Sequence, residues 1–205
     1  MPRRPAGTTR AGPPSSRRLL LGAIGAAVAA ALLAVAVARF DLLPGARIGG
    51  DFALVDHEGR RVRDADFRGS AMLVFFGFTH CPDVCPTALA RIAELLDALG
   101  PEAGAVRALF VSVDPRRDTP ALLRDYVAHF SPRIVGLTGS EAEIAAAARA
   151  YRAYYRIAGD PRTNPDYLVD HSSFVYVMDR TGRFVGSFNP DAPVETGLRL
   201  VRRAL

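Results

Sequence analysis

Lysine is absent from this chain of 205 residues, and cysteine occurs only twice, at Cys81 and Cys85. All 26 basic residues are arginine, a pattern that no single site explains and that we attribute to codon usage. Two cysteines allow at most one disulfide within the chain, and this one would close a very short loop. Such a bridge constrains the unfolded chain little, so stability alone is a poor reason for the pair. No internal repeat is found, which argues against a repeat architecture.

Acidic residues are missing from Met1–Arg18, which holds five of the arginines. Without this arm, 21 basic residues face 21 acidic ones, so the formal net charge of +5 belongs to the arm alone. A balanced remainder argues against nucleic-acid binding, which depends on a basic surface. We therefore expect no nucleic-acid partner.

Charge of either sign is missing from Leu19–Ala38, a run of twenty residues. This length is sufficient for a helix to cross a bilayer core. The preceding arginines would keep residues 1–18 in the cytoplasm and place the remainder on the other side. A cleaved signal peptide is the alternative, because Ala36-Val37-Ala38 fits a cleavage site. Residues 16–20 also faintly resemble a twin-arginine signal. The anchor is favoured since the run is longer than a usual signal core, and both alternatives deliver the domain to the same side.

Residues 39–50 read as a tether, and residues 51–205 have the size of a single domain. Met72–Phe78 and Val106–Val113 are continuous apolar runs, typical of buried strands. Apolar residues at helical spacing over Thr87–Leu99 predict an amphipathic helix between them. Further helices are predicted over Thr119–His129, Ser140–Tyr154 and from about Pro193, a short strand over Ile134–Leu137, and hairpins pairing Phe52–Val55 with Arg61–Arg63 and Ser172–Met178 with Phe184–Phe188. This order predicts a three-layer α/β domain.

Each cysteine precedes a proline, and the pair directly follows a predicted central strand. Proline is well accepted at the first position of a helix, so we expect a helix beginning at Pro86 with Cys85 as its cap. The positive end of the helix dipole lowers the pKa of a thiol and favours the reactive thiolate. The pattern therefore favours a reactive pair, with a structural disulfide as the alternative. Strand, cysteines and helix follow one another as in the thioredoxin fold, with one residue more between the sulfurs.

Three motifs together resemble the Sco/SenC family of membrane-anchored, thioredoxin-like proteins that handle copper for cytochrome c oxidase assembly. The motifs are Phe76–Thr87, Val111–Pro120 and Asp166–Ser172, and the similarity extends over residues from about 19 to 200. The family has proline where this chain has Asp51, a departure that touches no ligand. The resemblance implies copper as the bound ion, with Cys81, Cys85 and His171 as its ligands.

The chemistry of these three residues agrees with copper. Thiolates select Cu(I), and imidazole suits copper in either oxidation state. Zinc with a water as fourth ligand is the alternative, although Cu(II) ranks above Zn(II) in the general affinity order. A disulfide between Cys81 and Cys85 would release the metal, so the same pair is also a candidate redox disulfide. His171 is expected to open the core strand that follows the loop Gly159–Asp170, and this loop is expected to be mobile without metal.

The resemblance implies a copper metallochaperone that delivers copper to the CuA site of an oxidase subunit, or maintains the thiols of that site. A thiol–disulfide oxidoreductase acting on an exported protein is the alternative, and a peroxidase is a weaker one. The spacing of four between the cysteines favours the chaperone, because redox pairs usually have the form Cys-x-x-Cys. Expected partners are the CuA-bearing subunit, other copper carriers or thiol reductants, and the inner membrane, with the domain facing the periplasm.

The remaining histidines are assigned structural roles. His80 neighbours a cysteine, but strand alternation would point it away; His57 reads as a turn residue and His129 as a helix-end residue. Asp114 and Asp118 read as cap and turn residues.

Overall fold

The computed structural model describes residues 25–35 and 48–205. The chain divides into two units, Met1–Ala46 and Arg47–Leu205. In the first unit, residues 25–35 form a helix, and the rest of the predicted segment Leu19–Ala38 lies outside the described residues. The predicted basic arm, residues 1–18, and most of the predicted tether lie outside them as well. Within the described ranges, none of the helices combines the length and the apolar character that crossing a membrane requires.

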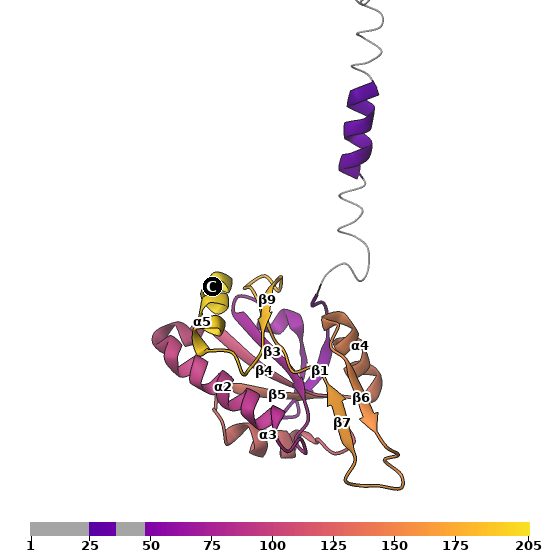
Figure 1. Ribbon diagram of the computed structural model, residues 1–205, viewed down its shortest axis with the longest axis vertical. Helices are drawn as coiled ribbons and strands as arrows, with labels where there is room; N and C mark the ends of the chain where they lie inside the picture. Colours follow the sequence, from indigo (N-terminus) through magenta and orange to yellow (C-terminus); the bar gives the residue numbers. More distant parts are fainter. Residues whose placement is uncertain (1–24, 36–47) are drawn as a thin grey trace, which may run out of the picture. The chain divides into compact units, whose positions relative to one another are not determined.

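The second unit is built around a sheet of seven strands in the order β2-β1-β5-β4-β3-β8-β9 (Figure 1). These strands are β1 (Ala53–Asp56), β2 (Arg61–Arg63), β3 (Ala71–Gly77), β4 (Val106–Ser112), β5 (Ile134–Thr138), β8 (Val175–Met178) and β9 (Phe184–Phe188). Strands β3, β4 and β5 run parallel, whereas β1, β8 and β9 pair antiparallel with their neighbours. The predicted strands and both hairpins are confirmed, except that the strand expected from Ser172 begins at Val175.

Strand β3 lies in the middle of the sheet because all seven of its residues are apolar or glycine and all are buried. It pairs with β4 from Ala71↔Val106 to Gly77↔Ser112 on one side, and with β8 on the other. A strand buried on both faces needs this continuous apolar run rather than alternation. Its carboxyl end, at Gly77, is where the cysteine-bearing loop begins.

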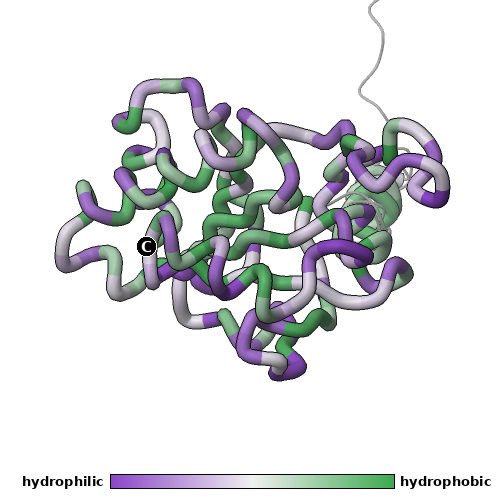
Figure 2. Tube along the Cα trace, turned by 90° about the horizontal axis from the view of Figure 1, so that it is seen from below, coloured by the Kyte–Doolittle hydropathy of each residue, from purple (hydrophilic) through white to green (hydrophobic). Residues whose placement is uncertain are grey.

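Helices cover both faces of the sheet, which confirms the predicted three-layer α/β architecture. The helices are α2 (Val84–Leu99), α3 (Pro120–Ala128), α4 (Glu141–Tyr151) and α5 (Val194–Ala204), with 3-10 turns at Asp64–Phe67 and Gly100–Ala105. On one face, Tyr126 of α3 packs against Phe110, and α5 packs against α2. On the other face, Tyr151 of α4 packs against Phe76. Figure 2 shows hydrophobic residues concentrated in the central strands and polar ones on the outside.

A second, two-stranded sheet stands apart from the main one and was not predicted. Strands β6 (Tyr155–Ala158) and β7 (Leu168–His171) form an antiparallel hairpin whose connecting loop projects from the domain (Figure 1). The expectation that residues 168–170 belong to a loop is therefore wrong. So is the expectation that His171 opens a core strand, because it ends β7, four residues before β8 begins.

The chain enters this unit at the end of the sheet that lies away from Gly77. The backbone N–H of Gly49 donates to the carbonyl of Ala150, at the end of α4, over 2.9 Å. Gly49 has a φ of +87°, and a Cβ there would lie 2.3 Å from the terminal carbon of Met178. Met178 pairs with Met72, near the first residue of β3. Glycine is therefore favoured at this point by its backbone conformation, which residues with a side chain rarely adopt.

Candidate metal centre

The two cysteines lie in the connection from β3 to α2. Cys81 is in the loop, where its backbone N–H donates to the carbonyl of Phe78. Cys85 is the second residue of α2, which begins at Val84 after the N-cap residue Asp83. The prediction that the helix begins at Pro86 is therefore wrong by two residues. Pro86 is tolerated in the first turn because backbone N–H groups there have no partner within the helix.

The two cysteine side chains differ in exposure, and the sulfur of Cys81 contacts the backbone at the start of α2. Both are free thiols; Cys85 is completely buried, whereas Cys81 is partly exposed. The backbone N–H of Cys85 donates to Sγ of Cys81 over 3.4 Å. A sulfur that accepts from the first turn of a helix is stabilised as a thiolate.

The pKa values of the two thiols move in opposite directions. A hydrogen bond from the Cys85 thiol lowers the pKa of Cys81 to about 3, against the opposing effect of burial and with a further contribution from His171. The same hydrogen bond raises the pKa of Cys85, and burial raises it further. The lowered pKa favours the thiolate at the accessible sulfur, and the raised pKa favours the protonated thiol at the buried one.

His171 reaches the cysteine pair from the end of β7. Its Nε2 atom lies 3.2 Å from Sγ of Cys85. Its other ring nitrogen, Nδ1, is 3.0 Å from the carbonyl oxygen of Ser172, so a proton on Nδ1 is donated to this oxygen. This hydrogen bond leaves the lone pair of Nε2 directed at the sulfur, the tautomer that a ligating histidine needs.

The walls of the site are aromatic and hold the imidazole edge-on. The ring of His171 meets Phe75 and Phe78 in T-shaped contacts, with centroids 5.9 and 5.8 Å apart. Burial opposes protonation of His171, but hydrogen bonds to the Cys81 sulfur and the Ser172 carbonyl, together with the charge of the Cys81 thiolate, raise the pKa of the imidazole. The site therefore combines an apolar wall with one anionic sulfur.

The three side chains form a compact group of potential metal ligands. One atom from each of Cys81, Cys85 and His171 lies within 4.8 Å of the other two. The structure thus brings together all three residues that the sequence analysis selected. Two sulfurs and one imidazole nitrogen suit a soft metal ion in a three-coordinate site, with room for a further ligand.

Gly77, the last residue of β3, is required by the closeness of Cys85. A Cβ at this position would lie 2.6 Å from Sγ of Cys85 and 2.8 Å from a ring carbon of Phe110. Any side chain would therefore push the buried sulfur or the core aromatic out of place. The sequence analysis did not identify this requirement, although the glycine ending an apolar strand was visible.

Two aspartates next to the site are buried. Asp114 opens a turn, as expected, because its carbonyl accepts from the backbone N–H of Arg117 over 3.2 Å, whereas neither aspartate is the N-cap of α3. Asp114 and Asp118 lie in the loop between β4 and α3 and are 1% and 0% exposed. The N-cap of α3 is Thr119, whose side chain accepts from the backbone of Leu122. Burial raises the pKa of Asp118, although hydrogen bonds from Ser112 and Thr79 oppose this. The two carboxylates therefore have a structural role beside the site.

The other histidines lie outside the group of three. His80 is exposed, with its Nδ1 3.0 Å from the hydroxyl of Thr79. His57 accepts a hydrogen bond from the backbone N–H of Gly136 over 2.8 Å and so ties the β1–β2 turn to β5. His129 contacts the carbonyl of Asp125 at the end of α3.

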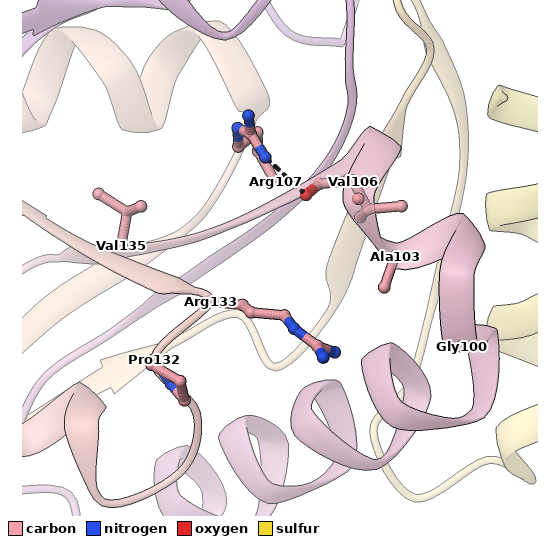
Figure 3. A pocket seen from close by; sticks show the side chains of 8 residues that line it. Gly100, Ala103, Val106, Arg107, Pro132, Arg133 and Val135 are labelled. Atoms are coloured by element: carbon pink, nitrogen blue, oxygen red, sulfur yellow. Dashed lines mark hydrogen bonds between the residues drawn. The ribbon is translucent and has the colours of Figure 1, made fainter.

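A surface hollow lies at the beginning of β4 and β5, whereas the cysteines follow the last residue of β3, which runs parallel to β4. It is lined by residues at the beginning of β4 and before β5, among them Arg107 and Arg133 (Figure 3). Both arginine side chains are engaged with backbone carbonyls, of Val106 and Leu96 respectively. This hollow therefore makes no contribution to the group of Cys81, Cys85 and His171.

Comparisons with known proteins agree on one family. The chain is 40% identical over 215 residues to the mitochondrial SCO2 homologue of Bos taurus, covering 97% of this chain and 80% of the relative. The structure of Bradyrhizobium japonicum ScoI with copper bound matches with a TM-score of 0.71 and 46% identity, over 77% of this chain and 99% of that one. A structure that identified a disulfide switch in BsSco, a member of the Sco family of cytochrome c oxidase assembly proteins, matches with a TM-score of 0.63 and 26% identity, over 77% and 93%.

These matches confirm the thioredoxin-like α/β fold of the domain. The SCO1/SenC family model matches residues 41–205, which include both cysteines, His171 and the buried aspartates. The chain therefore belongs to the SCO1/SenC family.

Proposed function

We propose that this protein binds one copper ion through Cys81, Cys85 and His171 and serves in the assembly of cytochrome c oxidase. The observation that carries this proposal is the approach of the three ligand atoms to within 4.8 Å of one another. A site made of two thiolates and one imidazole holds Cu(I) through its sulfurs and accommodates Cu(II) with the imidazole. Its open coordination suits a protein that must release the ion again.

The relatives support copper and the pathway. ScoI of Bradyrhizobium japonicum has been solved with copper bound, and BsSco belongs to a family of cytochrome c oxidase assembly proteins. The acceptor we propose is the oxidase subunit that carries the CuA site, with other copper carriers or thiol reductants as further partners. The protein would deliver copper to that site or keep its thiols reduced.

The proposed location is the inner membrane, with residues 51–205 on the periplasmic side and residues 1–18 in the cytoplasm. Two observations support an anchor at residues 19–38. Residues 25–35 are helical, and Leu32 and Leu33 are 66% and 67% exposed on this helix. The uncharged run is also long enough for a bilayer core, and basic residues precede it.

A second function, thiol–disulfide exchange, is favoured by the asymmetry of the cysteine pair. Cys81 is accessible and has a lowered pKa, whereas Cys85 is buried behind it. The Cys81 thiolate would attack a substrate disulfide, forming a mixed disulfide and releasing one substrate thiolate. Cys85 would then lose its proton, attack Sγ of Cys81 and release the second thiolate. The pair would end as a disulfide, with two electrons passed to the substrate.

Metal analysis of the full chain tests the proposal. Reduced protein, purified in detergent without oxygen and loaded with copper, should retain one copper ion per chain after gel filtration. The Cys81→Ser/Cys85→Ser double variant should retain none, because both sulfur ligands are lost. Stoichiometric copper in the double variant would refute the site, and preference for zinc in a competition would refute the metal.

A further inference from the structure

Two buried carboxylates on one loop hold the two halves of the site. Asp118 accepts hydrogen bonds from the hydroxyl and the backbone N–H of Thr79, over 2.6 and 3.1 Å. It also accepts from the hydroxyl of Ser112 over 2.6 Å. Thr79 lies two residues before Cys81, so Asp118 fixes the start of the cysteine-bearing loop against the end of β4.

Asp114 makes the equivalent contact to the segment that carries His171. One of its oxygens accepts a hydrogen bond from the hydroxyl of Tyr167 over 2.5 Å. Its other oxygen accepts from Nε of Arg117, a side chain that is itself 15% exposed. Tyr167 directly precedes β7, the strand that ends in His171.

Arg117 completes the contact by binding the backbone before β7. Its two terminal nitrogens donate to the carbonyls of Pro165 and Tyr167, over 3.1 and 2.9 Å. The guanidinium also lies 3.7 Å from the centroid of the Tyr167 ring, within cation–π distance. A planar guanidinium can make all these contacts at once because its donors have a fixed geometry. The Arg117–Asp114–Tyr167 cluster therefore fixes both the backbone and the side chain at the start of β7.

The hairpin that carries His171 needs such support. It pairs only with itself, as a two-stranded sheet, and a hairpin of this kind is marginally stable on its own. The residues between its strands, from 159 to 167, are mostly exposed, apart from the buried Tyr167. The cysteines, by contrast, are held by the central strand and a long helix. His171 is thus the ligand whose position depends on contacts outside its own sheet.

We infer that the Arg117–Asp114–Tyr167 cluster positions His171 over the cysteine pair and thereby sets the preference of the site between Cu(II) and Cu(I). This inference rests on the proposed copper function. Cu(I) is held by two thiolates nearly alone, whereas Cu(II) needs the imidazole nitrogen as well. Loosening the cluster therefore weakens Cu(II) binding while leaving Cu(I) binding nearly intact.

The test compares Arg117→Gln and Tyr167→Phe with the control Arg116→Gln, all in the full chain in detergent. Arg116 neighbours Arg117 but is exposed and pairs with Glu141 over 2.7 Å, away from the cluster. In Arg117→Gln, the dissociation constant for Cu(II) should rise about 10- to 100-fold, while that for Cu(I) changes by less than about threefold. Tyr167→Phe loses one hydrogen bond and keeps the ring, so it should fold and show a smaller change in the same direction. Arg116→Gln should match wild type.

Two further measurements separate positioning from general stability. In the metal-free protein, backbone amides of β7 should exchange with deuterium faster in Arg117→Gln and Tyr167→Phe, but not those of α2. In a His171→Ala background, Arg117→Gln should cause no further change in the ratio of the two copper affinities, because it acts through the imidazole.

Equal weakening of both oxidation states would overturn the inference and leave the cluster a purely structural role. An unchanged Cu(II) spectrum with unchanged exchange of β7 in Tyr167→Phe would overturn it as well. If wild-type protein binds no copper, the proposed function fails, and unchanged exchange of β7 in the variants would then overturn the positioning role separately.

Discussion

The Nε2 atom of His171 lies 3.2 Å from Sγ of Cys85, although 86 residues separate them in the chain. The two side chains come from different parts of the fold: Cys85 lies in the first turn of α2, and His171 ends the small hairpin of β6 and β7. Because no local segment contains all three candidate ligands, the site exists only in the folded domain. Metal binding and the packing of the small hairpin are therefore linked.

Replacing His171 should weaken the binding of Cu(II) more than the binding of Cu(I). His171→Ala should leave the domain folded, at a cost of about 1–2 kcal/mol in the free energy of unfolding, because the edge contacts with Phe75 and Phe78 and the hydrogen bond to the Ser172 carbonyl are lost. The affinity for Cu(II) should fall by at least about tenfold and that for Cu(I) by much less. Competition titrations with a chromophoric chelator measure both. His129→Ala is the matched control, and an unchanged Cu(II) spectrum in His171→Ala would contradict the ligand assignment.

Replacing Gly77 displaces the buried sulfur. Gly77→Ala places a Cβ 2.6 Å from Sγ of Cys85, so we expect a loss of about 1–3 kcal/mol in stability from overpacking. Copper retention should fall as well, because Cys85 must move. Gly104→Ala is the control, since a Cβ there meets nothing within 4 Å. Chemical denaturation and metal analysis measure the two effects, and a Gly77→Ala variant with wild-type stability would show that the site can adapt.

The reactivity of Cys81 should be nearly independent of pH. Since hydrogen bonding from Cys85 lowers the pKa of Cys81 to about 3, its thiolate is already formed between pH 5 and pH 8. An ordinary thiol, with a pKa near 8.5, would react about tenfold more slowly for each pH unit below that value. Alkylation of metal-free protein by iodoacetamide, followed by mass spectrometry, measures the rate at each cysteine. Cys85, buried and with a raised pKa, should be modified slowly.

The control for this experiment removes the hydrogen-bond donor. In Cys85→Ala, the pKa of Cys81 should rise toward its ordinary value, and a pH dependence should return. A wild-type rate that falls tenfold per unit from pH 8 to pH 6 would mean that Cys81 is protonated in this range and that its pKa is not lowered.

The location of the protein can be settled by fractionation. We expect the mature protein to stay in the membrane pellet after alkaline carbonate extraction, with an intact N-terminus. Protease added to spheroplasts should digest the domain from outside. A soluble product that begins near Arg39 would instead identify residues 19–38 as a signal peptide.

The main sheet and its helices can be predicted from the sequence, because their buried residues follow recognisable apolar patterns. Met72–Phe78 and Val106–Val113 are continuous apolar runs, which favours burial. Between them, apolar residues recur at helical spacing. The small hairpin could not be predicted in the same way. Its strands, Tyr155–Ala158 and Leu168–His171, are four residues long and mix charged with apolar residues. Their stability comes from tertiary contacts, which local patterns do not record.

The candidate ligands could be chosen from residue type and family resemblance. The residues that hold them in position could not be predicted in this way. Asp114 and Tyr167 are 53 residues apart, and each has an ordinary local interpretation, as a turn residue and as an aromatic beside a loop. Only the fold shows that the carboxylate is buried and that its partners come from the segment leading to His171. The start of α2 at Val84 was also missed, because Pro86 is a good first helical residue but is tolerated equally well as the third.

The contact of Gly49 with Ala150 marks the end of the sheet at which the chain enters the domain. The chain joins the domain near the first residues of β3, whereas the sulfur and nitrogen ligands open beyond its last residue. The point where the chain enters the domain and the three candidate ligands thus lie at opposite ends of the central strand. A protein that receives the proposed copper ion can therefore approach the ligands at the carboxyl end of β3, away from the point near Gly49 where the chain enters.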